Sequence, residues 1–256
     1  MSNRSTMRDT LNREPFEVHQ PSETAPAFGF THRVGTPALR AEVAAHLAAC
    51  YDAGRYPVFG STMVRVRLTR EDSATQGTFV MPAYRDENGQ IVTGRLGGAI
   101  SVNINDGFGW RMTAAHEVIH ALQYATGVLS GRMVGGRRVR FFNHGAAWLL
   151  TQVVRGAEID ADTWTEAERH GETVTMGVRG QGTHHHYVAS HHERQAFRLT
   201  PAMLAATGHG PTTRDYRAGL ALARATFSSV RYVHGGLSRS EADAASRAAT
   251  AEASRP

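Results

Sequence analysis

The sequence predicts an α+β fold, and three observations lead to this prediction. Period-2 alternation of apolar and polar residues, typical of half-buried strands, recurs between residues 63 and 105. Two segments with helical periodicity, residues 37–53 and 110–126, lie on either side of these strands. The second half of the chain reads as mostly helical. Strands and helices therefore form separate runs rather than strict alternation, which favours the α+β class.

The first helix is expected over residues 37–53. Pro37 stands near its start, where a missing N–H costs nothing, and Gly54 follows its end. Between them Leu39, Val43 and Leu47 recur at helical spacing and define one apolar face.

A group of strands follows this helix. Residues 63–69 alternate apolar side chains with arginines, which predicts a strand with one solvated face. Residues 78–83 form a second expected strand. The turn sequence at residues 86–89 ends in Asn-Gly, so the chain should reverse there as a hairpin and return through Ile91 and Val92.

The next strand leads directly into the most informative helix. Within residues 99–105, Ile100, Val102 and Ile104 alternate with polar residues, as in a half-buried strand. A Gly-Phe-Gly loop separates this strand from the helix expected over residues 110–126. The apolar positions of that helix are Met112, Ala115, Ile119 and Leu122, and Gly127 is its expected C-terminal stop.

The C-terminal half is expected to be helical in four places, with an irregular Gly- and His-rich stretch at residues 157–187. The expected helices are residues 144–156, 188–198, 201–207 and 214–232. We expect three parts in the chain: a polar leader at residues 1–35, one domain over residues 36–236, and an Ala-rich tail at residues 237–256.

The helix at residues 110–126 carries the pentapeptide His-Glu-Val-Ile-His. Residues four apart share one helix face, so His116 and His120 can reach a single metal ion. Glu117 can then lie beside a water molecule on that ion and accept its proton. The pattern predicts Zn²⁺ as the cofactor and hydrolysis as the reaction.

In these residues the chain resembles the zincin metallopeptidases, a resemblance carried by His116, Glu117, His120 and the strand before them. It implies a mixed sheet whose edge strand borders the cleft and pairs with an extended protein or peptide substrate. The strand at residues 99–105 would be this edge, with Ser101 and Asn103 facing substrate.

A catalytic zinc ion needs a third protein ligand. The metzincin extension is excluded, since Gln123 and Thr126 stand where it has Gly and His. The alternative is a glutamate on a later helix, as in gluzincins. Glu193 is the best candidate, because Glu193 to Ala196 resembles the Glu-x-x-Ala motif of minimal gluzincins; the chain departs from them at Phe197, where many have an acidic residue.

Other third ligands remain open. One of the histidines at positions 184–186, 191 or 192 is the main rival. The acidic residues between positions 158 and 168 are better explained as solvated surface. If Glu193 is the ligand, residues 128–187 form an insertion beside the cleft. Tyr187 and His185 are then the nearest candidates for stabilising the oxyanion that develops during hydrolysis.

Composition limits the cellular setting. No apolar run has the length needed to cross a bilayer, and residues 1–20 lack the apolar core of a secretory signal. We expect a protein that is cytoplasmic at synthesis and has no membrane partner, with signal-less export or delivery to another cell left open. The single cysteine, Cys50, is expected to be a small buried side chain.

Arginine supplies all 28 basic residues, and the formal net charge is +5. The densest cluster is Arg137, Arg138 and Arg140, next to aromatic residues. The alternation there favours a strand with exposed arginines over contact with nucleic acid. The alternative function is an arginine-rich nucleic-acid-binding or host-interaction protein with a structural or vestigial metal site. A coincidental pentapeptide on a core helix is the third interpretation, and it predicts no metal.

Overall fold

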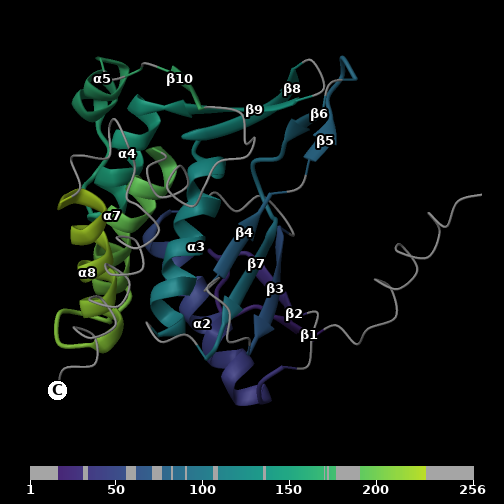
Figure 1. Cartoon of the computed structure of the whole chain (residues 1–256), viewed down its shortest axis with the longest axis vertical. Coiled ribbons are helices and arrows are strands. Elements are labelled where there is room, and N and C mark those ends of the chain that lie inside the picture. The colour runs from purple at the N-terminus through teal and green to yellow at the C-terminus, as the bar shows by residue number, and fades with distance from the viewer. Residues whose placement is uncertain are drawn as a thin grey trace, which may run out of the picture.

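The structure, a computed structural model, has an α+β architecture with two sheets (Figure 1). It describes residues 17–30, 34–55, 62–70, 77–81, 83–89, 91–105, 109–134, 137–169, 171, 173–176 and 191–228. Six helices occur in this part of the chain: α2 (Pro37–Ala53), α3 (Trp110–Ala125), α4 (His144–Val154), α5 (Ala161–Arg169), α7 (His191–Ala206) and α8 (Arg214–Ser228). The predicted α+β class is confirmed.

The first sheet is mixed and has the strand order β1-β2-β3-β7-β4. The three central strands run parallel, and the two outer strands run antiparallel to their neighbours. Its strands are β1 (Glu17–His19), β2 (Ala27–Phe30), β3 (Met63–Thr69), β7 (Ala99–Asn103) and β4 (Gly77–Val80). Figure 1 shows α3 between this sheet and the helix pair α7 and α8.

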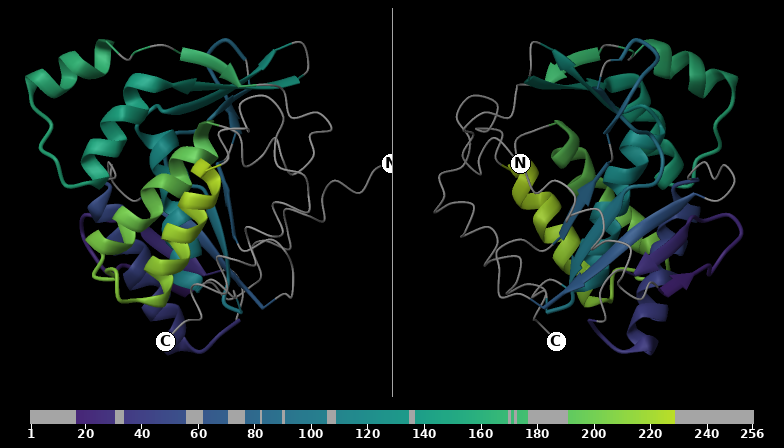
Figure 2. Two further views of the ribbon diagram at one scale, coloured as in Figure 1. Left: turned by 60° about the vertical axis from the view of Figure 1, so that its left-hand side comes forward. Right: turned by 90° about the vertical axis from the view of Figure 1, so that its right-hand side faces the viewer.

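The second sheet is antiparallel throughout, in the order β10-β9-β8-β6-β5. In both views of Figure 2 it lies at one end of the molecule, beyond the first sheet. Its strands are β5 (Ala83–Arg85), β6 (Ile91–Thr93), β8 (Leu129–Val134), β9 (Arg137–Asn143) and β10 (Thr173–Met176). The expected hairpin is confirmed, since Arg85 pairs with Ile91 across a turn in which Gly89 has φ of 71°.

The core forms where α2 and α3 pack against one face of the mixed sheet. On β3, Val64, Val66 and Leu68 are buried while the arginines between them are exposed, as the alternation predicted. Tyr51 of α2 packs its ring 5.8 Å from that of Phe28 on β2. On α3 the predicted apolar positions, Met112, Ala115, Ile119 and Leu122, are all buried. This packing fixes the face of α3 that carries the motif.

Two boundaries were predicted closely because their signals are local. Helix α2 begins after Thr36, whose hydroxyl accepts a hydrogen bond from the Leu39 N–H at 3.2 Å, and it ends at Gly54. Helix α3 ends at Ala125 with Thr126 as its C-cap, and Gly127 follows with φ of 78°. Helix α3 starts at Trp110 with Gly109 as its N-cap, and Thr113 lies in the first turn.

The prediction that residues 99–105 form an edge strand is wrong. Strand β7, with Ser101 and Asn103, lies inside the sheet, because β3 pairs with it on one side and β4 on the other. The edge of the sheet on this side is β4, a four-residue strand that runs antiparallel to β7. Asn103 is buried, and its side chain accepts a hydrogen bond from the Asn105 N–H.

Three further expectations differ from the structure. Residues 17–30, expected in the leader, form β1 and β2, because Phe28 and Phe30 are buried in the core. Within the stretch expected to be irregular, α5 and β10 form. The helices expected at residues 188–198 and 201–207 are one helix, α7, which continues through Pro201 because Leu199 and Met203 are buried on either side. The expected tail lies outside the described residues.

In the part of the chain described here, no helix is both long and apolar enough to cross a membrane.

Candidate metal centre

Helix α3 brings the two histidines of the motif onto one buried face. His116 and His120 are each 6% exposed, and their ring centroids lie 4.8 Å apart. The spacing of four residues places them one turn apart, and packing of α3 against the sheet holds that face toward α7. The expected juxtaposition of the two imidazoles is therefore present.

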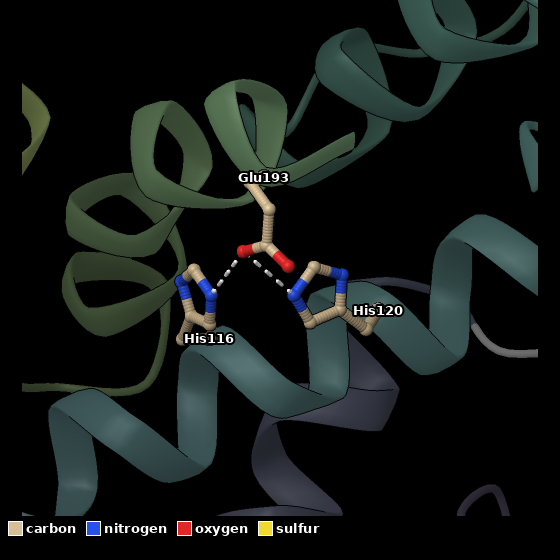
Figure 3. A group of neighbouring side chains, drawn as sticks. All are labelled: His116, His120 and Glu193. Carbon is tan, nitrogen blue, oxygen red and sulfur yellow. Dashed lines mark hydrogen bonds and ion pairs between the residues drawn. The ribbon is translucent and has the colours of Figure 1, made fainter. Parts of the chain in front are cut away.

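Helix α7 completes the group with Glu193, which is 1% exposed (Figure 3). Its Oε2 lies 3.2 Å from Nε2 of His116 and 3.3 Å from Nε2 of His120. Figure 3 shows both imidazoles turned toward this carboxyl group from the facing helix. One ligand atom from each residue lies within 4.8 Å of the other two, so the group could hold a metal ion.

The electrostatics of the group favour a positive charge at its centre. Burial alone would raise the pKa of Glu193, but His120 and His116 hold it well below its ordinary value. Burial would lower the pKa of His120, yet the Glu193 carboxylate raises it to about 9. Burial lowers the pKa of His116, which favours its neutral form. A buried carboxylate facing two imidazoles is thus arranged to hold a cation or a proton.

The atoms that face one another in this group suit a metal ion. Nε2 of His120 is buried, and within the described structure it has no hydrogen-bond partner apart from its ion-pair contact with Glu193 at 3.3 Å. The two ring nitrogens and one carboxylate oxygen are all atoms that can donate a lone pair to a metal. An ion between them would satisfy the buried nitrogen.

Glu117 lies on the side of α3 that faces the edge strand β4. It is 4% exposed, and its carboxyl group accepts a hydrogen bond from the backbone of Phe79 on that strand. Burial raises its pKa to about 8, although the nearby His120 acts in the opposite direction. A Cβ atom at Gly77 would lie 2.9 Å from Oε1 of Glu117, so glycine permits this close approach.

Of the rival third ligands, two can be compared with Glu193. His192 is buried, and its Nε2 lies 3.5 Å from Oε1 of Glu193, but it is not part of the three-residue group. His191 is exposed and stacks against Phe142, with ring centroids 5.4 Å apart. The rivals at positions 184–186, and the expected oxyanion stabilisers Tyr187 and His185, lie outside the described residues.

Sequence reasoning missed several residues that surround the two imidazoles. Gln123 accepts a hydrogen bond from Nδ1 of His120 at 2.9 Å, and Thr200 lies 3.4 Å from Nδ1 of His116. The ring of Phe197 packs 4.4 Å from that of His116. Helical spacing offered a signal: Gln123 is three residues after His120, while Phe197 and Thr200 follow Glu193 by four and seven.

Comparison with protein-family models, with curated proteins and with solved structures found no match to this chain.

Proposed function

We propose that this chain is a zinc-dependent peptidase of zincin-like, gluzincin-type architecture. The observation that carries the proposal is the convergence of His116, His120 and Glu193, with Glu117 on the same helix beside a sheet edge. Two imidazoles and one glutamate are a donor set used by catalytic zinc sites, which keep a fourth position for water or substrate. This donor set favours zinc over Mg²⁺ or Ca²⁺, which prefer oxygen ligands.

His116, His120 and Glu193 would hold the zinc ion. When bound, zinc supplies Lewis acidity, which acidifies a water molecule and polarises the carbonyl of a peptide bond. Glu117 then accepts a proton from water and passes it to the leaving amine. A neighbouring cation lowers the pKa of a carboxyl group, so Glu117 would be ionised and ready to act as a base.

The substrate is proposed to bind along β4 rather than β7. Within the described structure β4 pairs with one strand only, so its outer side presents backbone groups to an extended peptide. Phe79 of this strand contacts Glu117, and Val80 beside it is 58% exposed. A peptide added here would lie next to the general base.

The proposal is tested with Glu117→Gln and His116→Ala, both compared with wild type. We expect wild type to cleave members of a library of unfolded peptides, with cleavage read by mass spectrometry. Glu117→Gln should keep its zinc and lose cleavage, whereas His116→Ala should lose both. Full cleavage by the zinc-loaded Glu117→Gln protein would contradict the assigned base.

The arginine-rich alternative remains a prediction. The strand prediction for its cluster is confirmed as β9, but the side chains of Arg137 and Arg138 lie outside the described parts. Salt-sensitive binding of the metal-free protein to nucleic acid, without peptide cleavage, would favour it.

A further inference from the structure

The outer nitrogens of both histidines are held by hydrogen-bond acceptors whose orientation is dictated by their own surroundings. For His120 this acceptor is Oε1 of Gln123, at 2.9 Å. Gln123 is fully buried, so each polar atom of its amide needs a partner. Its Nε2 donates to the carbonyl oxygen of His192 at 2.8 Å and to Oε1 of Gln195 at 3.0 Å.

The direction of these hydrogen bonds is set by Gln195, which lies at the other end of the series from His120. Nε2 of Gln195 lies 2.6 Å from the carbonyl oxygen of Ala147 on α4. A carbonyl oxygen only accepts, so the amide nitrogen of Gln195 must face it, and its Oε1 must face Gln123. The amide nitrogen of Gln123 is then committed to donating, and its Oε1 is left to face His120. That oxygen can only accept, so Nδ1 of His120 must carry a proton.

Thr200 imposes the same direction on His116. Its hydroxyl donates its single proton to the carbonyl oxygen of Ala196, one turn earlier on α7, at 2.8 Å. Only the lone pairs of Oγ1 then remain for Nδ1 of His116, which lies 3.4 Å away. Thr200 is fully buried, so water does not replace this contact.

We propose that Thr200 and the Gln195–Gln123 amide pair are positioning residues that set the Nδ1–H tautomer of His116 and His120. With the proton on Nδ1, the Nε2 atoms of both histidines, which lie 3.2 and 3.3 Å from Oε2 of Glu193, are free to give their lone pairs to an ion held between the three residues. One helix, α7, thus supplies a ligand, Glu193, and anchors both of the others. The inference rests on the proposed zinc centre and deepens it.

This arrangement explains why α7 must pack on α3 as one continuous helix. Glu193 and Thr200 are separated by two helical turns and contact the same imidazole from either end. A break in α7 between Glu193 and Thr200 would separate the ligand from the residue that anchors His116. The Phe197 ring between them packs on His116 but offers no acceptor, so Thr200 alone provides it on this side within the described structure.

The test measures zinc affinity by competition with a chromophoric chelator. Loss of such anchors typically weakens metal affinity about tenfold to a hundredfold, and we expect this for Thr200→Val and for Gln123→Met. Thr200→Ser keeps the hydroxyl and should restore affinity to within about threefold of wild type. Thr207→Val is the matched control, because Thr207 also bonds a carbonyl on α7 but contacts no ligand, and its zinc affinity should equal that of wild type.

A spectroscopic readout separates tautomer control from a general loss of structure. In the cobalt-substituted protein each Nδ1–H next to the ion should give a shifted proton NMR signal that exchanges with deuterium. Wild type should show two slowly exchanging signals, and Thr200→Val should retain one. Thermal unfolding of each variant shows whether it is folded.

The outcomes distinguish this inference from the proposed function. Wild-type zinc affinity and two slowly exchanging signals in Thr200→Val would overturn the inference alone. Failure of Thr200→Ser to restore affinity would overturn the role of the hydroxyl. Absence of zinc binding by the wild-type protein would overturn the zinc centre itself, and this inference with it.

Discussion

Gly77 of the edge strand lies directly against Glu117 of the motif helix. A Cβ atom at this position would lie 2.9 Å from Oε1 of Glu117 and 2.5 Å from Cγ2 of Thr113. Cβ atoms in proteins do not approach other heavy atoms so closely, and an added methyl group would push β4 away from the carboxyl group. The close approach of β4 to Glu117 therefore depends on the absence of a side chain at Gly77.

Gly77→Ala is expected to reduce peptide cleavage more than zinc binding, because it displaces the strand and Glu117 but touches none of the three ligands. A misplacement of about 1 Å at a reacting group can lower the rate about a hundredfold. The measurement compares cleavage of the unfolded peptide library with zinc affinity for each protein. Gly210→Ala is the control, since a Cβ there meets nothing within 4 Å. Unchanged cleavage by Gly77→Ala would show that the position of β4 does not affect the reaction.

Zinc is expected to stabilise the folded chain, because the three ligands meet only in the native structure. With zinc at about a hundred times its Kd, the free energy of unfolding should rise by about 2.7 kcal/mol. Chemical denaturation with and without zinc measures this change. Glu193→Gln should lose most of the rise, since an amide oxygen is a poorer metal ligand than a carboxylate. An equal rise in that variant would place the ion elsewhere.

A separate buried histidine should make the fold sensitive to acid. His46 of α2 donates a hydrogen bond to the carbonyl oxygen of Arg111, and burial lowers its pKa from an ordinary 6.5 to about 4. The His209 ring, the Arg111 charge and the Cys50 thiol lie close to His46, and the positive charges of Arg111 and of protonated His209 also lower its pKa. Between these pKa values the unfolded chain binds the proton and the folded chain does not, so stability falls as the pH falls.

The expected loss from this histidine is about 2 kcal/mol between pH 7.5 and pH 5, on the scale of 1.36 kcal/mol per pKa unit. Urea unfolding at the two pH values measures it. His46→Gln can still donate to the Arg111 carbonyl but does not titrate, so its stability should fall less over the same range. Equal falls in both proteins would assign the acid sensitivity to other groups.

The central part of the site was predictable from the sequence because its signal is local. The spacing of His116 and His120 fixes their shared face, and the apolar residues between and around them fix which way that face points. Glu193 was chosen by resemblance, and the structure brings it to the two imidazoles. Its distance along the chain, 77 residues from His116, placed it beyond any argument from helical spacing.

The edge strand could not be predicted because strand order is a long-range property. Alternation in residues 99–105 identified a strand correctly, but a buried strand and an edge strand share that alternation. The true edge, β4, has only four residues and precedes β7 in the chain. The anchors Gln123 and Thr200 were missed for a related reason, since their role depends on how α3, α4 and α7 pack together.

Elemental analysis of the purified protein, after dialysis against zinc and removal of loosely bound metal, tests the central claim most directly. The account predicts one zinc ion per wild-type chain and almost none in Glu193→Ala, with both proteins folded by thermal unfolding. A wild-type chain without zinc, or a full equivalent retained by Glu193→Ala, would contradict the assignment of His116, His120 and Glu193 as a metal centre.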